Sequence, residues 1–239
     1  MYKKISDYGI IGDLHSIALV GLDGSIDWFC LPYIDSPSIF AALLDDKEGG
    51  RFSISPLDDW DSAAECIPDT NILVTKFRTR TGVMQVTDFM PIFSGGEAEY
   101  GGEQHELYRL VEVTKGKVDV GLSFEPRFNY SRGRASLKKG KRAIIARGNG
   151  DSIVLSSTHD LQLGDGKAEA KWSMSEGEQL WLHLRYGVEE PIELDREKAA
   201  TYLRETEAYW RSWFKKRKIG RTIEEDRNLV EEKEERIHN

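Results

Sequence analysis

The chain has 239 residues with 33 Lys and Arg against 41 Asp and Glu, which gives a formal charge of −8. A content of 39% hydrophobic and 10% aromatic residues is too high for a disordered polyelectrolyte and is sufficient for a sizeable core. The negative charge argues against a general nucleic-acid binder, and only two cysteines exclude a Cys-rich disulfide scaffold and an all-Cys zinc site.

This length fits one large domain or two small ones, and all-β folds often reach it as a single unit. The first nine residues lack the continuous apolar core of a signal peptide. No stretch approaches the roughly 18 apolar residues that a membrane-spanning helix needs. Cys30 and Cys66 are the only thiols, which fits a reducing compartment, and one disulfide between them is the alternative. We therefore expect no membrane association and a cytoplasmic location.

Most of the sequence reads as short strands separated by turns. Five strand–turn–strand patterns follow one another, each with a Gly-containing turn: 17–21 with 25–30, 71–80 with 83–89, 107–114 with 118–124, 143–147 with 152–157, and 161–163 with 168–174. A last strand is predicted over 180–186, where apolar residues alternate. Turn signals about every ten residues predict antiparallel sheets packed face to face.

Two segments depart from this pattern. Residues 36–44 begin with Ser36 and Pro37, an N-cap type residue followed by Pro at the first helical position, and predict a short helix. From Asp195, another N-cap type residue, apolar residues recur at three- and four-residue spacing as far as Phe214 and predict a longer helix. Beyond Gly220 a solvated, partly frayed helix is predicted. The resulting division is a β-domain over 1–192 and a helical linker over 193–239.

The sequence contains no motif for a metal, a nucleotide or a serine nucleophile. The five histidines are scattered without an i, i+4 pair, and we interpret them as surface or satisfied strand residues. We therefore expect no metal site and no cofactor. Carboxylate pairs perform glycoside hydrolysis, but the sequence does not show which of the 41 acidic residues face each other across a cleft.

Two further features allow a functional interpretation. Residues 127–147 contain eight Lys and Arg, no Asp or Glu, and two aromatic residues, a composition that can bind single-stranded nucleic acid. An exposed hairpin is the better interpretation, so no nucleic-acid partner is expected. The six tryptophans are of a type that packs on sugar rings, and Trp28 and Trp60 lie beside loop-like, Asp-rich sequence, whereas the other four fall on apolar faces that favour core packing.

Three N-terminal segments, 5–13, 18–32 and 35–44, carry a resemblance to a known family. The second includes the run DGSIDWFCLP, and the third begins with DSPSIFAALL. With later motifs at 68–73, 86–91, 126–130 and 209–213, these segments resemble the bacterial and archaeal proteins of glycoside hydrolase family 15, the glucoamylase-like and trehalase-like enzymes. The similarity covers about residues 3–220 in order.

The resemblance implies an all-β fold, a β-supersandwich of two large antiparallel sheets with a C-terminal helical linker. In the family this domain precedes an (α/α)6 barrel, whose two glutamates act as general acid and general base with inversion. Only 26 residues follow Trp213 in this sequence. We therefore expect that the barrel and its catalytic pair are absent, and that the isolated chain is inactive.

The resemblance thus implies a non-catalytic N-terminal domain that packs on and supports a glucan- or trehalose-hydrolysing barrel, supplied in cis or in trans. Asp27, Trp28, Asp35, Ser36 and Pro37 are candidates for the rim of the sugar pocket or for the contact with the barrel. Capping of turns and closure of the sheet edge is the alternative role for this segment. A stand-alone carbohydrate-binding module, with α-glucan or trehalose as ligand, is the alternative function. An uncovered barrel-facing surface further predicts self-association, or a disordered tail from about residue 219.

Overall fold

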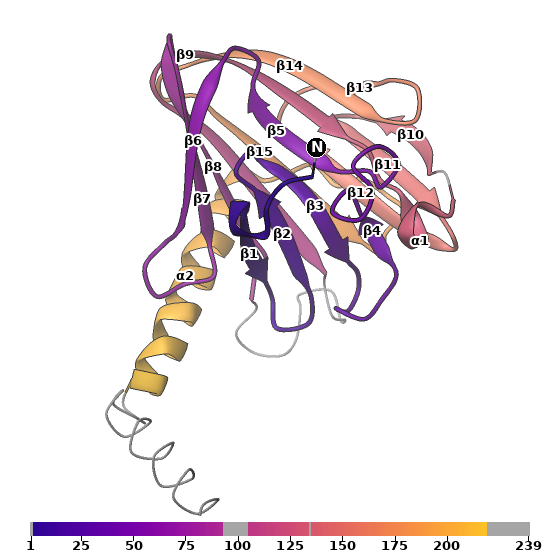
Figure 1. The fold of residues 1–239 in the computed structure, drawn as a ribbon, viewed down its shortest axis with the longest axis horizontal. Helices are drawn as coiled ribbons and strands as arrows, with labels where there is room; N and C mark the ends of the chain where they lie inside the picture. The colour runs from indigo at the N-terminus through magenta and orange to yellow at the C-terminus, as the bar shows by residue number, and fades with distance from the viewer. Residues whose placement is uncertain (1, 93–104, 134, 219–239) are drawn as a thin grey trace, which may run out of the picture.

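The computed structural model describes residues 2–92, 105–133 and 135–218, and the predicted tail from residue 219 lies outside these ranges. Fifteen strands and one long helix make up most of the described chain (Figure 1), so the all-β prediction is confirmed. A 3-10 helix, Ile5–Asp7, and a single turn, α1 (Phe128–Ser131), complete the elements. Within the described ranges, no helix combines the length and the apolar composition that a bilayer crossing requires.

The strands form two antiparallel sheets that share one strand. The hydrogen-bonded order in the first sheet is β1 (Tyr8–Gly12), β2 (Ile17–Gly21), β3 (Ser25–Cys30), β5 (Phe52–Pro56), the second half of β9 (Glu106–Phe124), β14 (Ala168–Ser175) and β13 (Gln162–Leu163), with β4 (Ser38–Phe40) beside β3. The order in the second sheet is β6 (Trp60–Cys66), β7 (Leu73–Thr79), β8 (Gly82–Phe89), the first half of β9, β15 (Gln179–Tyr186), β12 (Asp151–Ser157), β11 (Ala143–Gly148) and β10 (Ser136–Gly140).

The predicted hairpin of 107–114 with 118–124 is wrong, because these residues belong to the single shared strand β9. Residues 107–124 form no hairpin, because the chain continues through Lys115 and Gly116 as a single strand of 19 residues. Its first half pairs with β8 and β15, and its second half pairs with β5 and β14. Gly116 has a φ of +69°, and a Cβ there would lie 2.3 Å from the carbonyl oxygen of Thr81. This glycine redirects the strand from one sheet to the other instead of reversing it.

The core lies between the two sheets, and a buried ion pair lies within it. Phe40, Phe52 and Phe124 form a cluster of ring contacts with centroids 5.4–6.4 Å apart. Beside them, the fully buried Arg109 on β9 donates to both carboxylate oxygens of Asp88 on β8, at 2.7 and 3.1 Å. It also donates to the backbone oxygens of Phe52 and Gly24, each at 2.8 Å. This guanidinium therefore connects the two sheets.

The short helix predicted over 36–44 is wrong. Ser38–Phe40 forms β4 instead, which pairs with β3 and is followed by turns. Ile39 and Phe40 are buried in the core between the sheets, and the Ile39 carbonyl accepts a hydrogen bond from the Arg127 backbone. Burial of these two large side chains outweighs the local helix-start signal of Ser36 and Pro37.

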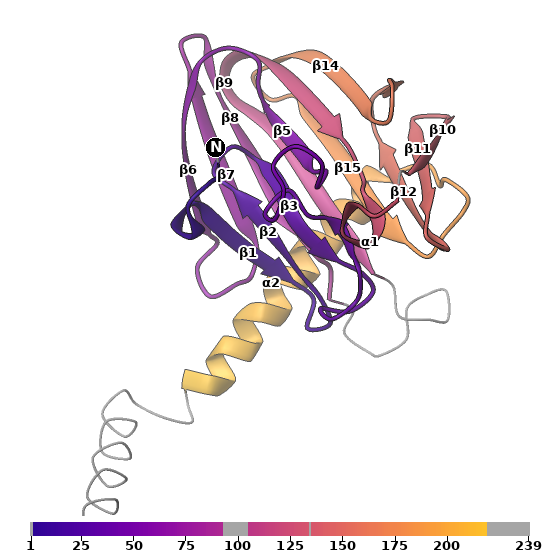
Figure 2. The ribbon, with the colours of Figure 1, turned by 45° about the vertical axis from the view of Figure 1, so that its right-hand side comes forward.

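The C-terminal helix, α2 (Arg196–Lys218), is confirmed and lies on the outer face of the second sheet (Figures 1 and 2). Asp195 caps it, since its Oδ1 accepts hydrogen bonds from the backbone N–H groups of Glu197 and Lys198 at 2.9 and 3.1 Å. Ala199 packs in a small apolar cluster with residues of β8, β9 and β15. In both views the second half of α2 projects away from the sheets.

Candidate functional site

A cleft of about 840 Å³ opens where the end of β15, the connection 187–195 and the first turns of α2 meet. Its lining combines aromatic side chains with carboxyl groups and two cationic groups, and Pro32 reaches it from the loop after β3. Ligand sites in proteins are commonly concavities of roughly 300–1,000 Å³ with a few placed polar groups. This cleft is therefore the candidate functional site.

The floor of the cleft is built on a row of stacked rings. The register of three neighbouring strands places Phe89, Tyr108 and His183 directly opposite one another. Phe89 and Tyr108 stack with centroids 5.3 Å apart, and Tyr108 and His183 stack at 4.0 Å. Tyr202 of α2 meets Tyr108 edge-on at 6.1 Å. The sheet thus fixes the rings of the floor, and the helix closes over them.

A buried polar group lies on this floor. Oε2 of Glu106 accepts a hydrogen bond from the Tyr108 hydroxyl at 3.2 Å and lies 3.0 Å from Nε2 of His183. Burial lowers the pKa of His183 in spite of the neighbouring Glu106. Burial, with Glu106 close by, raises the pKa of Tyr108 well above its usual value. At neutral pH, His183 is uncharged and Tyr108 keeps its proton.

The rim carries most of the charge. Arg185 donates from Nη2 to the Glu190 carbonyl at 2.9 Å and so holds the connection 187–195 against β15. Lys198 Nζ lies 5.6 Å from the centre of the Tyr202 ring. The acidic residues of the lining are Glu106, Glu189, Glu190, Glu193 and Asp195. Of these, Glu189 pairs with Arg147 at 3.3 Å. The lining of the cleft therefore contains more acidic than basic residues.

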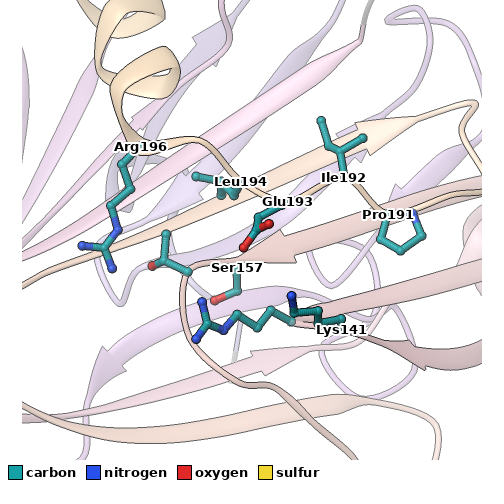
Figure 3. Close-up of a pocket in the computed structure, with 9 residues that line it drawn as sticks. Lys141, Ser157, Pro191, Ile192, Glu193, Leu194 and Arg196 are labelled. Atoms are coloured by element: carbon teal, nitrogen blue, oxygen red, sulfur yellow. The ribbon is translucent and has the colours of Figure 1, made fainter.

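A smaller pocket of about 200 Å³ lies on the other side of the same connection (Figure 3). Residues 192–194 line both hollows. Figure 3 shows Glu193 directed toward Ser157, with Lys141 and Arg196 on opposite sides of the pocket. Burial and the positive charges of Arg196 and Arg142 lower the pKa of His159. This pocket is electropositive, in contrast to the cleft.

Asp27, one of the predicted site residues, belongs to a different cluster. It is buried on β3, where its Oδ2 lies 2.5 Å from Lys3 Nζ and accepts a hydrogen bond from the Tyr8 hydroxyl at 2.7 Å. Lys3 also pairs with Asp23 at 2.7 Å. None of the residues that line the small hollow around Asp27, about 150 Å³, comes from 35–37. The structure therefore separates Asp27 from the other candidates.

The remaining candidates lie near the surface. Trp28 is half-buried, with its ring 6.2 Å from that of Tyr130. Asp35 and Pro37 are exposed, and Ser36 closes a turn, since its backbone N–H donates to the Tyr33 carbonyl and its hydroxyl accepts from the Tyr33 N–H. Neither a rim role nor a contact with a barrel is tested by these positions, so both stay predictions.

Beside this turn lies an exposed apolar group that we call the loop patch: Leu14, Tyr33 and Ile34. These side chains are 59%, 43% and 56% exposed. The two loops that carry them are joined by a hydrogen bond from the Ile34 N–H to the His15 carbonyl at 3.1 Å. In Figures 1 and 2 both loops lie at the end of the molecule toward which α2 projects.

The two aromatic residues of the basic segment 127–147 differ in exposure, since Phe128 is fully buried and Tyr130 is 39% exposed. Phe128 is buried in the core, and Tyr130 lies against Trp28. The exposed lysines and arginines of the segment lie mainly on the β10–β11 hairpin, so the expected exposed hairpin is present, and the absence of a nucleic-acid partner stays a prediction. Within the described ranges, no group of three or more metal-binding side chains is present.

The sequence patterns do not predict Glu106, Tyr108 and His183 as site residues. One signal was available: in 180–186 the side chains between the alternating leucines are Trp181, His183 and Arg185, a mixed face that a solvent-facing strand would not need. That face lies beneath α2, as Trp181 packs in the same cluster as Ala199. The partner residues on β9 depend on the strand register, which no local pattern provides.

Comparisons with known proteins match residues 2–210 to a family described as trehalase-like, N-terminal. The trehalase of Thermoplasma volcanium is 32% identical over 217 residues, which cover 89% of this chain and 34% of that protein. The trehalase of Thermoplasma acidophilum is 32% identical over 82% of this chain and 33% of its own length. The trehalase of Mycolicibacterium smegmatis is 29% identical over 89% and 35%. The chain spans about a third of the length of these curated relatives.

Proposed function

Since the chain belongs to the trehalase-like N-terminal domain family, we propose that it is a non-catalytic domain that packs on and supports the catalytic domain of a glycoside hydrolase. In this proposal the partner is an (α/α)6 barrel of the glycoside hydrolase family 15 type, supplied in cis or in trans. Its substrate is trehalose or a related glucan. The choice of trehalose as substrate is supported by the relatives of this chain, which are named trehalases.

The extent of the match supports a division of labour. About two-thirds of each relative has no counterpart in this chain, and the matched third is described as an N-terminal domain. Function belongs to particular sites rather than to a fold, so the family alone does not assign hydrolysis to the β-domain. The catalytic acid and base therefore belong to the unmatched part.

We place the contact with the catalytic domain at the loop patch. Leu14, Tyr33 and Ile34 expose large apolar side chains in two adjoining loops, a feature typical of protein–protein contacts. Asp35, Ser36 and Pro37 continue the same loop, and Asp35 and Ser36 form its polar border. In this arrangement the DSPS segment contacts the catalytic domain, while Asp27 and Trp28 hold the strand behind it.

The projecting half of α2 carries a second aromatic group. Tyr209, Trp213 and Phe214 are half-buried and form a chain of ring contacts with Trp210. Nε1 of Trp210 is buried, and no acceptor for it lies among the described residues. Aromatic residues with an unused donor are typical of interface anchors. Without its partner, this surface promotes self-association of the chain.

A cytoplasmic location belongs to the same proposal. Cys30 and Cys66 are both free thiols, and free thiols are common in a reducing compartment. Burial raises the pKa of Cys30 to about 11, so this thiol is protonated and unreactive at neutral pH.

The proposal is tested in a chimera that carries this chain in place of the N-terminal third of Thermoplasma volcanium trehalase. We expect the chimera to hydrolyse trehalose, and the triple variant Leu14→Ser, Tyr33→Ser, Ile34→Ser to lose activity at least about tenfold. The matched control, Leu57→Ser with Leu163→Ser, changes exposed leucines outside the loop patch and should retain activity. Equal activity of the two variants would contradict the assignment of the interface.

A further inference from the structure

We propose that the cleft between β15 and α2 is a binding site for a neutral saccharide within this chain itself. The inference deepens the proposed function, on which only the choice of trehalose as the first probe rests. Four properties of the described residues fit such a ligand: the size of the cleft, its aromatic surfaces, its buried polar group and its charge.

The cleft has the size and construction of a ligand site. Its volume of about 840 Å³ lies within the range of small-molecule sites and accommodates a disaccharide. Its walls come from a sheet on one side and a helix on the other, and the Arg185–Glu190 hydrogen bond holds the connecting segment in place. Such a site exists before the ligand arrives and needs little reorganisation.

Aromatic rings provide the surfaces that sugars use. Tyr186 and Tyr202 line the cleft from opposite elements and are half-buried, so part of each ring faces the open space. Tyr186 is fixed by a hydrogen bond from its hydroxyl to Asp151, and Tyr202 by its edge contact with Tyr108. The C–H faces of a pyranose pack on rings held in this way, as apolar groups do on other aromatic surfaces.

The floor provides directional polar groups. Glu106 is buried, yet its carboxyl group lines the cleft together with His183. A buried carboxyl group is costly unless it is hydrogen-bonded, and Glu106 receives one hydrogen bond from Tyr108 and lies 3.0 Å from the imidazole nitrogen. Sugar hydroxyls both donate and accept hydrogen bonds, so they suit a floor that presents a carboxyl group beside a neutral imidazole.

Charge decides between classes of ligand. Setting aside Glu193, which points into the smaller pocket, and Glu189, which pairs with Arg147 at 3.3 Å, three acidic and two basic residues line the cleft, so it disfavours phosphates and other anions. The smaller pocket across the connection has the opposite character, with Lys141, Arg142 and Arg196 among its lining residues. Arg185 and Lys198 stand on the rim and oppose a simple cation site. A neutral polyhydroxylated ligand meets all of these conditions.

The test is calorimetric titration of the 239-residue chain with trehalose, with glucose 6-phosphate and putrescine as anionic and cationic probes. We expect saturable binding of trehalose only. Tyr202→Ala and Glu106→Gln should each weaken binding about tenfold or more, which corresponds to about 1.4 kcal/mol. The matched controls Tyr2→Ala and Glu169→Gln, both exposed and outside the cleft, should change affinity less than about twofold.

A readout in the unaltered chain keeps the test independent of the folding of the variants. Trehalose should shift the imidazole NMR signals of His183 and His105, which line the cleft, and leave those of His159 unchanged. Lack of saturable binding, tighter binding of either charged probe, or shifts at His159 alone would overturn the inference. These outcomes are separate from the chimera experiment, because they are measured on the isolated 239-residue chain with the loop patch unaltered and without a catalytic domain.

Discussion

Strand β9 carries two buried acid–base pairs on its opposite faces, and they differ in how completely they are satisfied. On the core face, Arg109 uses three nitrogens to contact both oxygens of Asp88 and two backbone carbonyls. On the outer face, Glu106 meets His183 and Tyr108 at the floor of an open cleft. The two sites lie only a few residues apart along the strand.

This difference indicates a structural role for the Arg109–Asp88 pair and a binding role for the Glu106–His183 pair. The Arg109–Asp88 pair has no room for a ligand, because both side chains are fully buried and the guanidinium lies 4.8 Å from the centre of the Phe52 ring. It fixes how the two sheets face each other. The Glu106–His183 pair keeps contact with a cavity, and its histidine stays neutral because of burial. A buried polar pair that lines an open cavity is the better candidate for binding.

The largest effect is expected from breaking the satisfied pair. Asp88→Ala leaves the Arg109 guanidinium buried without its carboxylate, which should lower the free energy of unfolding by about 3–5 kcal/mol. Urea unfolding followed by tryptophan fluorescence measures the change. The double variant Asp88→Leu with Arg109→Met removes both charges and should recover most of the loss. If the double variant is as unstable as Asp88→Ala, the pair is not the clamp that we describe.

The Asp27 cluster provides an intermediate case, since Asp27 is buried but Lys3 is partly exposed. Asp27→Asn should lower the free energy of unfolding by about 1–3 kcal/mol, because Lys3 and Tyr8 lose a charged partner. Lys3 keeps Asp23, which limits the effect. The same urea titration measures it. A loss as large as that of Asp88→Ala would remove the distinction between partly and fully buried pairs.

The outer pair should be visible in the pH dependence of stability. The pKa of His183 is lowered in the folded chain, so below the ordinary histidine value of 6.5 the unfolded chain binds a proton that the folded chain does not. Stability should therefore fall as the pH is lowered from about 6.5, by at most about 1.4 kcal/mol per pH unit for this one proton.

The measurement compares unfolding between pH 7 and pH 5.5 in chains with and without His183→Gln, which should flatten the slope. Both chains carry His159→Gln, because the pKa of His159 is lowered too and acts in the same direction. An unchanged slope after His183→Gln would mean that this imidazole gains its proton in the folded chain as readily as in the unfolded one.

The smallest effect on stability is expected in the DSPS segment. Asp35→Ala changes an exposed side chain and should alter the free energy of unfolding by no more than about 0.5 kcal/mol. In the trehalase chimera the same substitution should lower activity, since Asp35 borders the loop patch. A chimera that is unaffected by Asp35→Ala would assign this residue to the turn alone.

The sequence predicted those parts of the fold that local patterns determine. The hairpins within 71–89, 143–157 and 161–174 form as expected, and so does the helix after Asp195. The two errors arise where tertiary contacts override local signals. Lys115-Gly116 has the composition of a turn but redirects a strand, and Ser36-Pro37 has the composition of a helix start but precedes a strand that enters the core.

The candidate site was less accessible to such reasoning. Glu106 and His183 are 77 positions apart in the chain and meet only because β9 pairs with β15 in one register. Tyr202 joins them from a helix whose position depends on packing against the outer face of the sheet. A strand with polar residues on its second face indicates that something covers that face, but not which residues form the cleft.

The most direct test of the account is trehalose hydrolysis by the purified 239-residue chain, measured as glucose released. The account assigns binding to this chain and cleavage to a catalytic domain, so it predicts no release above the buffer blank. Release that co-purifies with the chain, disappears in Glu106→Gln and persists in Glu169→Gln would contradict it. Such a result would make the cleft on β9 and β15 an active site rather than a binding site.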